Sequence, residues 1–169
     1  MATMQKITTN LWFDNQAEEA ANFYVGIFKN AGILKTSRYG DEGQEIHHMP
    51  PGSVMAIEFQ LEGQRFVGLN GGPIFKFSEA ISFIVNCESQ DEVDFYWEKL
   101  NEGGDANAQQ CGWLKDKFGL SWQVVPTILT EMLTDKDHQK SERVMKAMLQ
   151  MKKIDIKKLE EAYDGGVLA

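Results

Sequence analysis

At 169 residues the chain is long enough for one domain of ordinary size or for two small halves that share a core. Its 25 acidic residues outnumber the 17 basic ones, and the formal net charge of −8 argues against a nucleic-acid-binding surface. No apolar stretch is long enough to span a membrane, and no basic-then-apolar leader opens the sequence, so we expect a cytoplasmic protein. Cys87 and Cys111 lack metal-ligand spacing, and both thiols are expected to be free.

The first half of the chain predicts a strand, a helix and three further strands. β-Branched and aromatic residues mark the strands, and alanine and aromatic residues at helical spacing mark a helix that runs to Phe28, with Asn15 as its N-cap. The Glu62-Gly63 turn joins the last two strands as a hairpin. The expected strands are residues 7–13, 33–39, 54–61 and 64–70.

A long loop is expected at residues 40–52, where glycine, two prolines and both His47 and His48 gather. A loop of this length beside a cavity is often a lid. Neighbouring residues on an extended chain point to opposite sides, so the two imidazoles are not expected to share a metal ion.

The pattern then repeats in the second half. Both expected helices carry Phe-Tyr, at residues 23–24 and 95–96, an offset of 72 residues, while residues 63–69 correspond to residues 119–125 at an offset of 56. Each half is therefore expected to be β-α-β-β-β, with a compressed loop and strand in the second copy. The expected elements are a strand at residues 80–85, a helix at residues 89–100, a loop and strand at residues 101–110 and a hairpin at residues 111–126.

The hairpin at residues 111–126 is the most informative stretch. It places Trp113, Trp122 and the amide of Gln123 on two strands joined by a turn at residues 116–119. Large aromatic side chains with one polar group are typical of a pocket wall, but a hairpin buried in a core has the same composition. Both interpretations remain open from these residues.

Three short helices are expected after Pro126. An apolar stripe that includes Val144, Met145 and Met148 marks the middle one. The stripe is compatible with packing onto the rest of the domain, with covering a pocket or with a dimer interface. The expected helices are residues 127–133, 138–151 and 156–163.

Four segments resemble the vicinal-oxygen-chelate superfamily, which includes glyoxalase I, the bleomycin-resistance proteins and extradiol dioxygenases. They resemble most closely its PhnB-like branch, labelled 3-demethylubiquinone-9 3-methyltransferase. The resemblance covers residues 5 to about 163 and implies an α+β fold, in which two βαβββ modules form one curved mixed sheet around a cup-shaped cavity, and a homodimer. The modules would be residues 5–72 and 73–126, followed by a helical extension at 127–169. The segments are residues 17–24, 69–73, 92–100 and 111–126.

Metal-dependent members of that superfamily place His, Glu or Gln on the first and last strands of each module. The best-matching positions here hold poor ligands, and an amide oxygen alone does not hold a transition metal against water. No Gly-rich turn follows a strand to cradle a nucleotide cofactor, so we expect neither a metal nor another cofactor. The positions are Thr8 or Thr9, Val67, Ser82 and Gln123.

The leading hypothesis is a metal-free protein that binds an unknown small molecule in the cup, closed by residues 40–53. Glu58 is either an inner polar group or a solvated outer one. The alternative is an enzyme, a lyase, isomerase or transferase that would use Glu58 or a histidine of the loop as general base, with its catalytic residues otherwise unknown. A third hypothesis is an interaction module built on the C-terminal helices. The predicted ligand-binding residues are Trp12, Glu58, Phe66, Trp113, Trp122 and Gln123.

Overall fold

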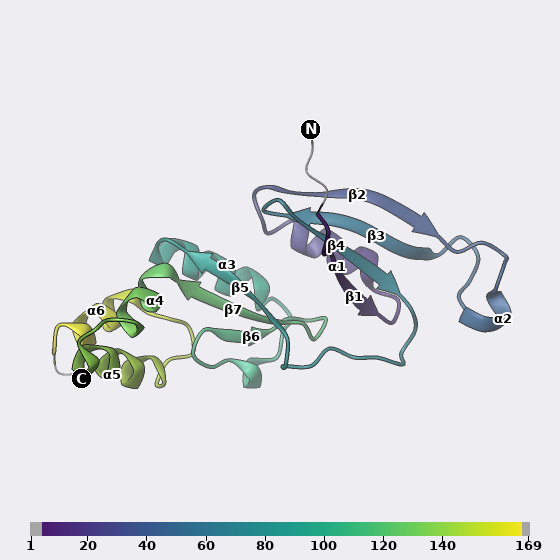
Figure 1. The fold of residues 1–169 in the computed structure, drawn as a ribbon. Coiled ribbons are helices and arrows are strands. Elements are labelled where there is room, and N and C mark those ends of the chain that lie inside the picture. The colour runs from purple at the N-terminus through teal and green to yellow at the C-terminus, as the bar shows by residue number, and fades with distance from the viewer. Residues whose placement is uncertain (1–4, 167–169) are drawn as a thin grey trace. The chain divides into compact units, whose positions relative to one another are not determined.

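The computed structural model describes residues 5–166, and the chain divides after Phe77 into two compact units (Figure 1). The predicted absence of a leader concerns in part residues 1–4, and the predicted helical extension includes residues 167–169. Both stretches lie outside the described range. Within the described range, the helices are all too short or too polar to cross a membrane.

The first unit has the predicted β-α-β-β-β order, with one extra turn of helix in the long loop. Its four strands form a sheet in the order β1-β4-β3-β2, in which β1 runs parallel to β4 and the other neighbours are antiparallel. The elements are β1 (Thr9–Phe13), α1 (Ala17–Val25), β2 (Ala31–Arg38), α2 (Gln44–His47), β3 (Val54–Leu61) and β4 (Gln64–Asn70).

Helix α1 differs from its prediction at both ends. Gln16, not Asn15, is the N-cap residue, and its side chain makes no capping hydrogen bond. The helix ends at Val25 rather than at Phe28, although Ile27 and Phe28 remain buried beside it. Apolar spacing alone therefore overestimated the length of the helix, because this spacing indicates which side chains are buried and not which conformation the backbone adopts.

Helix α1 packs on one face of the first sheet. A Cβ atom added to Gly68 on β4 would lie 3.2 Å from the Cβ of Ala17 and 3.2 Å from the Ile57 side chain, so helix and sheet are in close contact there. Phe59 stacks on Phe66, with ring centroids 5.4 Å apart, on the same face. Because side chains alternate along a strand, the residues between these face away from α1.

The second unit is βαββ followed by helices, one strand short of its prediction. Its sheet has the order β5-β7-β6, with β5 parallel and β6 antiparallel to β7. The elements are β5 (Ser82–Cys87), α3 (Gln90–Leu100), the 3-10 turn η1 (Ala106–Ala108), β6 (Trp113–Lys115), β7 (Ser121–Pro126), α4 (Thr127–Leu133), α5 (His138–Met148) and α6 (Ile156–Tyr163). The α+β class is confirmed.

Residues 101–110 form turns instead of the missing strand. Gly103 has a φ of +73°, and a Cβ on Gly104 would lie 2.4 Å from the backbone oxygen of Lys115, which leaves no room for a side chain. Asp105 then accepts a hydrogen bond from the Asn107 amide and caps η1. This glycine and Asx chemistry favours turns over a paired strand.

The repeat is confirmed in the helices and shifted in the first strands. Tyr24 and Tyr96, both buried, keep the predicted offset of 72 residues. Phe13 pairs with Asn70, however, and Cys87 pairs with Pro126, so β5 corresponds to β1 at an offset of 74. The shift of two residues preserves which side chains face the helix, because side chains alternate with a period of two.

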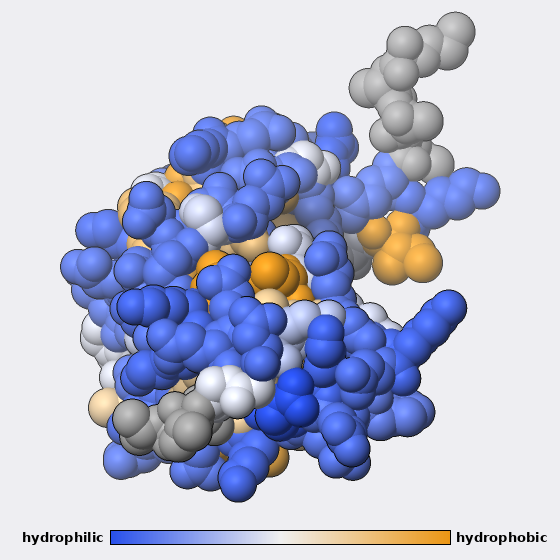
Figure 2. All heavy atoms as spheres, turned by 90° about the vertical axis from the view of Figure 1, so that its left-hand side faces the viewer, coloured by the Kyte–Doolittle hydropathy of each residue, from blue (hydrophilic) through white to orange (hydrophobic). Residues whose placement is uncertain are grey.

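The C-terminal helices pack around an apolar cluster within the second unit, which supports the packing interpretation of their apolar residues. Backbone hydrogen bonds join them to the hairpin: the amides of Cys111 and Gly112 donate to Met151 and Lys152 over 2.8 Å and 2.7 Å. Figure 2 shows that the side of the molecule bearing these helices is largely hydrophilic, with a small apolar patch near its centre. The cluster consists of Leu129, Met132, Val144, Ile154 and Leu159.

Candidate functional site

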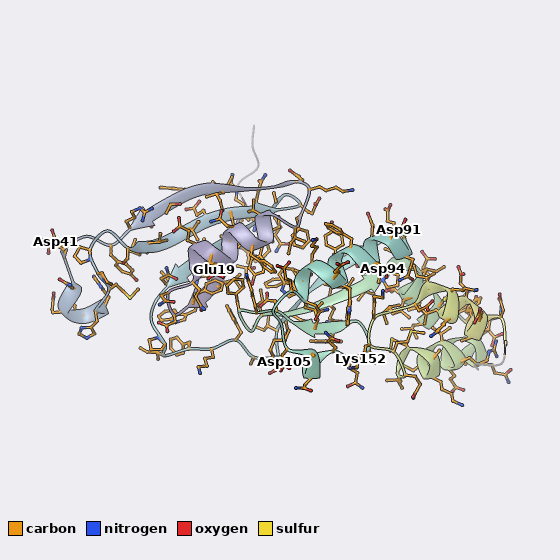
Figure 3. All side chains as sticks on the ribbon, turned by 180° about the vertical axis from the view of Figure 1, so that it is seen from behind. Glu19, Asp41, Asp91, Asp94, Asp105 and Lys152 are labelled. Atoms are coloured by element: carbon orange, nitrogen blue, oxygen red, sulfur yellow. The ribbon has the colours of Figure 1, made fainter. Side chains whose placement is uncertain are left out.

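Among the described residues of the second unit, a helix covers one face of the second sheet and leaves the other face uncovered. Helix α3 packs on β5 and β7, and Figure 3 shows it lying over the sheet with Asp91 and Asp94 on its surface. Trp122 and Val124 of β7 are buried on that face. The strand register places Ile84, Gln123 and Trp113 side by side on the opposite face, one from each strand.

Gln123 is the polar centre of this uncovered face. Its Nε2 donates a hydrogen bond of 2.9 Å to the hydroxyl of Ser82 on β5. This bond leaves the Gln123 carbonyl oxygen and the Ser82 hydroxyl hydrogen available to another molecule. Ile84, which is 56% exposed, and half-buried Trp113 flank the amide with apolar surface. The arrangement combines a fixed hydrogen-bonding pair with apolar walls.

The uncovered face is bounded at both ends. At one end the ammonium group of Lys115 pairs with Glu79, and this hydrogen bond lowers the pKa of the Glu79 carboxyl below its usual value. At the other end Val125 packs against the apolar cluster of the C-terminal helices. A bound molecule would therefore lie over β7 between these two limits.

Four of the six predicted ligand-binding residues lie on uncovered sheet faces. Trp113 and Gln123 lie on the second sheet, as described above. On the first sheet, Trp12 and Glu58 face away from α1, and the Trp12 indole donates 2.9 Å to the Gly72 carbonyl and packs edge-on to Phe75.

Phe66 and Trp122, the remaining two predicted residues, do not lie on the uncovered faces. Each points to the helix-covered face of its sheet, where Phe66 is 5% and Trp122 3% exposed. The Trp122 indole donates 2.8 Å to a carboxylate oxygen of Asp116. Trp122 and Gln123 are adjacent on β7 and face opposite sides of the sheet. The alternation of side chains along a strand therefore already argued against both residues lining one surface.

The four positions that match metal ligands in the superfamily do not provide a metal-binding set. Val67 has an aliphatic side chain, and Ser82 and Gln123 bond to each other. Within residues 5–166 no three His, Cys, Asp or Glu side chains gather so as to hold an ion. Hydroxyl and amide groups are weak ligands for transition metals, so the residues at these positions do not fit the metal of the superfamily.

The two thiols differ in accessibility. Burial, together with the nearby Glu92 carboxylate, raises the pKa of the Cys87 thiol from 9.0 to about 12, whereas Cys111 is half-buried. We expect a thiol-specific dye to modify Cys111 in the native protein and Cys87 only after unfolding. Because the unfolded thiol ionises first, stability should fall as the pH rises from 9.0 towards 12. Modification of both thiols at equal rates in the native protein would contradict the predicted difference in accessibility.

Comparison with known proteins gives a family model and solved structures that match most of the chain. The family model described as 3-demethylubiquinone-9 3-methyltransferase matches residues 5–125. A solved structure described as a putative 3-demethylubiquinone-9 3-methyltransferase, PhnB protein, from Bacillus cereus is 36% identical with a TM-score of 0.63, covering 73% of this chain and 100% of that chain. None of the curated proteins matches the chain.

Two further solved structures show likeness of fold alone. The fosfomycin resistance protein FosX from Listeria monocytogenes is 18% identical with a TM-score of 0.52, covering 80% of this chain and 100% of that chain. A Pseudomonas aeruginosa protein is 18% identical with a TM-score of 0.57, covering 73% of this chain and 98% of that chain. The family model stops before α4, so the helical extension lies beyond the residues that this model matches.

Proposed function

The chain belongs to the 3-demethylubiquinone-9 3-methyltransferase family, a PhnB-like branch of the vicinal-oxygen-chelate superfamily, and from this premise we propose that it binds a small organic molecule on the uncovered face of β5-β7-β6. The hydrogen bond from Gln123 to Ser82 carries the proposal. It holds two polar groups in place on a surface that no helix of this unit covers, between the side chains of Ile84 and Trp113.

The chemistry of this face favours a partly apolar ligand with at least one hydrogen-bond donor. The donor would reach the Gln123 carbonyl oxygen, and a flat apolar part would lie on the Trp113 ring. The ligand would bind without a resident metal, because the polar groups at the centre of the face are an amide and a hydroxyl.

Removing the central amide tests the proposal. With a ligand that co-purifies or emerges from a screen, Gln123→Ala is expected to weaken binding by about tenfold, since one buried hydrogen bond contributes roughly 1 kcal/mol. Trp113→Ala should weaken it further by removing the aromatic wall. Titration calorimetry measures both, with Gln150→Ala, an exposed glutamine on no sheet, as the control. Unchanged affinity in both variants would refute this site.

We also infer that the protein is a homodimer. The edge strand β2 exposes Ile33 at 38% and Leu34 at 43%, and a free edge with apolar side chains favours pairing with a second copy. Native mass spectrometry on the preparation used for the titration should give twice the subunit mass. The reduced thiols suit a cytoplasmic location.

A further inference from the structure

A hollow lies within the first unit, whereas the sheet face described above belongs to the second unit. It measures about 450 Å³ and opens where β1 and β2 end and α1 begins. Its volume is in the range of small-molecule sites, and four stretches of the chain contribute to its wall. The lining residues are Asp14, Asn15, Glu18, Arg38, Met49, Pro50, Ser53, Val54 and Asn70.

The hollow contains charges of both signs that do not pair with each other. Arg38 supplies a guanidinium group, and Asp14 and Glu18 supply carboxylates. Among the ion pairs of the described residues, none joins Arg38 to either acid. The guanidinium is held instead by a hydrogen bond of 3.1 Å from Nη1 to the Gly52 carbonyl. The opposite charges therefore share a space without neutralising one another.

Two of the other polar groups of the wall, Asn70 and Ser53, already have partners. The Asn70 side chain accepts from the Ala17 amide over 2.8 Å and donates to the Val54 carbonyl over 3.0 Å. The Ser53 hydroxyl donates 2.6 Å to the Pro50 carbonyl. The groups left to bind a ligand are thus the three charged side chains and the side-chain amide of Asn15.

The long loop supplies the apolar part of the wall. Met49 and Pro50 come from it, and the Met49 amide donates 3.0 Å to Nδ1 of His47. The His47 ring in turn lies 4.5 Å from the Tyr39 ring. Figure 3 shows this loop, with Asp41 labelled, extending beyond the ends of β2 and β3. The contacts of this loop place the Met49 side chain beside the charged groups of the hollow.

We propose that this hollow binds a free α-amino acid. The carboxylate would pair with Arg38, whose planar guanidinium suits a carboxylate, and the ammonium would pair with Asp14 and Glu18. The side chain would lie against Met49 and Val54. Because these three side chains are exposed, water solvates them in the free protein, and a zwitterion can pair with both signs of charge whereas an anion or a cation pairs with one.

The test is a titration of the full-length protein with each standard α-amino acid, in which heteronuclear NMR spectra are recorded at each ligand concentration. We expect saturable shifts at residues of the hollow with at least one amino acid. The N-acetyl derivative and the methyl ester of that amino acid should each bind about tenfold more weakly or worse, because each lacks one charge-assisted pair. Arg38→Gln and Glu18→Gln should weaken the free amino acid similarly.

Matched controls separate loss of charge from loss of fold. Lys76→Gln and Glu131→Gln remove exposed charges outside the hollow and should leave the affinity unchanged. Glu18 is exposed on the first turn of α1, so Glu18→Gln keeps the fold even if Arg38→Gln loosens the loop. The proposal is overturned if no amino acid gives a saturable shift at millimolar concentration, or if blocked and free amino acids bind equally.

Discussion

Replacing Asp116 by alanine is expected to lower the free energy of unfolding by about 3 kcal/mol or more. The carboxylate is 3% exposed and accepts three hydrogen bonds. Oδ1 accepts from the amides of Phe118 and Leu120 over 2.9 Å and 3.0 Å, and Oδ2 accepts from the Trp122 indole over 2.8 Å. Alanine would leave two buried donors, the Leu120 amide and the Trp122 indole, and the part-buried Phe118 amide without this acceptor, and each loss at a buried donor costs roughly 1–3 kcal/mol.

Asp105 provides the matched control for this effect. It also accepts a backbone amide in the second unit, from Asn107 over 2.9 Å, but its side chain is exposed. Asp105→Ala should therefore cost only about 1 kcal/mol. Urea denaturation monitored by circular dichroism measures both variants, and Trp122→Phe, which removes the indole donor and part of a buried ring, should fall between them. Equal costs for Asp116→Ala and Asp105→Ala would show that burial of the carboxylate has no role.

The hairpin illustrates what the sequence predicts well. An aspartate followed three residues later by glycine specifies a turn, and Asp116 and Gly119 form it, with the Gly119 amide donating to the Asp116 carbonyl over 2.9 Å. The sequence did not identify the Asp116 side chain as the buried acceptor for Trp122. That contact depends on which face of β7 is buried, which residue types alone did not decide.

Alternation settles that question once the covered face is known. Trp122 and Gln123 were both predicted in the pocket wall because both residue types suit a binding site, yet adjacent strand residues face opposite ways. The aromatic residue belongs to the core and the amide to the uncovered face. Residue composition predicted that this strand contributes to a binding site, whereas the alternation of side chains along the strand determines which positions face the core and which face the uncovered surface.

The charged hollow could not be predicted by any local pattern. Asp14 and Glu18 lie before and within α1, Arg38 ends β2, and Met49 lies in the long loop. No motif joins these positions, and only the folding of the first unit brings them to one space. The sequence indicated a flexible lid in the loop, but it carried no signal for the charges that the loop approaches.

Replacing Asn70 by alanine is expected to destabilise the first unit by about 2–4 kcal/mol. Its side chain, 4% exposed, accepts from the Ala17 amide at the start of α1 and donates to the Val54 carbonyl of β3. Gln16 gives α1 no side-chain cap, so Asn70 supplies the acceptor that the helix N-terminus otherwise lacks. Alanine would leave a buried donor and a buried acceptor unpaired.

Two further variants distinguish this explanation from a general intolerance of substitution. Asn70→Asp keeps an acceptor for Ala17 but places a carboxylate oxygen against the Val54 carbonyl, so it should also destabilise the protein. Asn22→Ala removes only an exposed bond from Asn22 to the Glu18 carbonyl, and alanine favours helices, so its effect should be within about 0.5 kcal/mol of zero. Thermal and urea unfolding measure all three. Equal stability of Asn70→Ala and Asn22→Ala would contradict the capping role, and loss of α1 amide protection in Asn70→Ala alone, measured by hydrogen exchange, would locate the damage at the helix start.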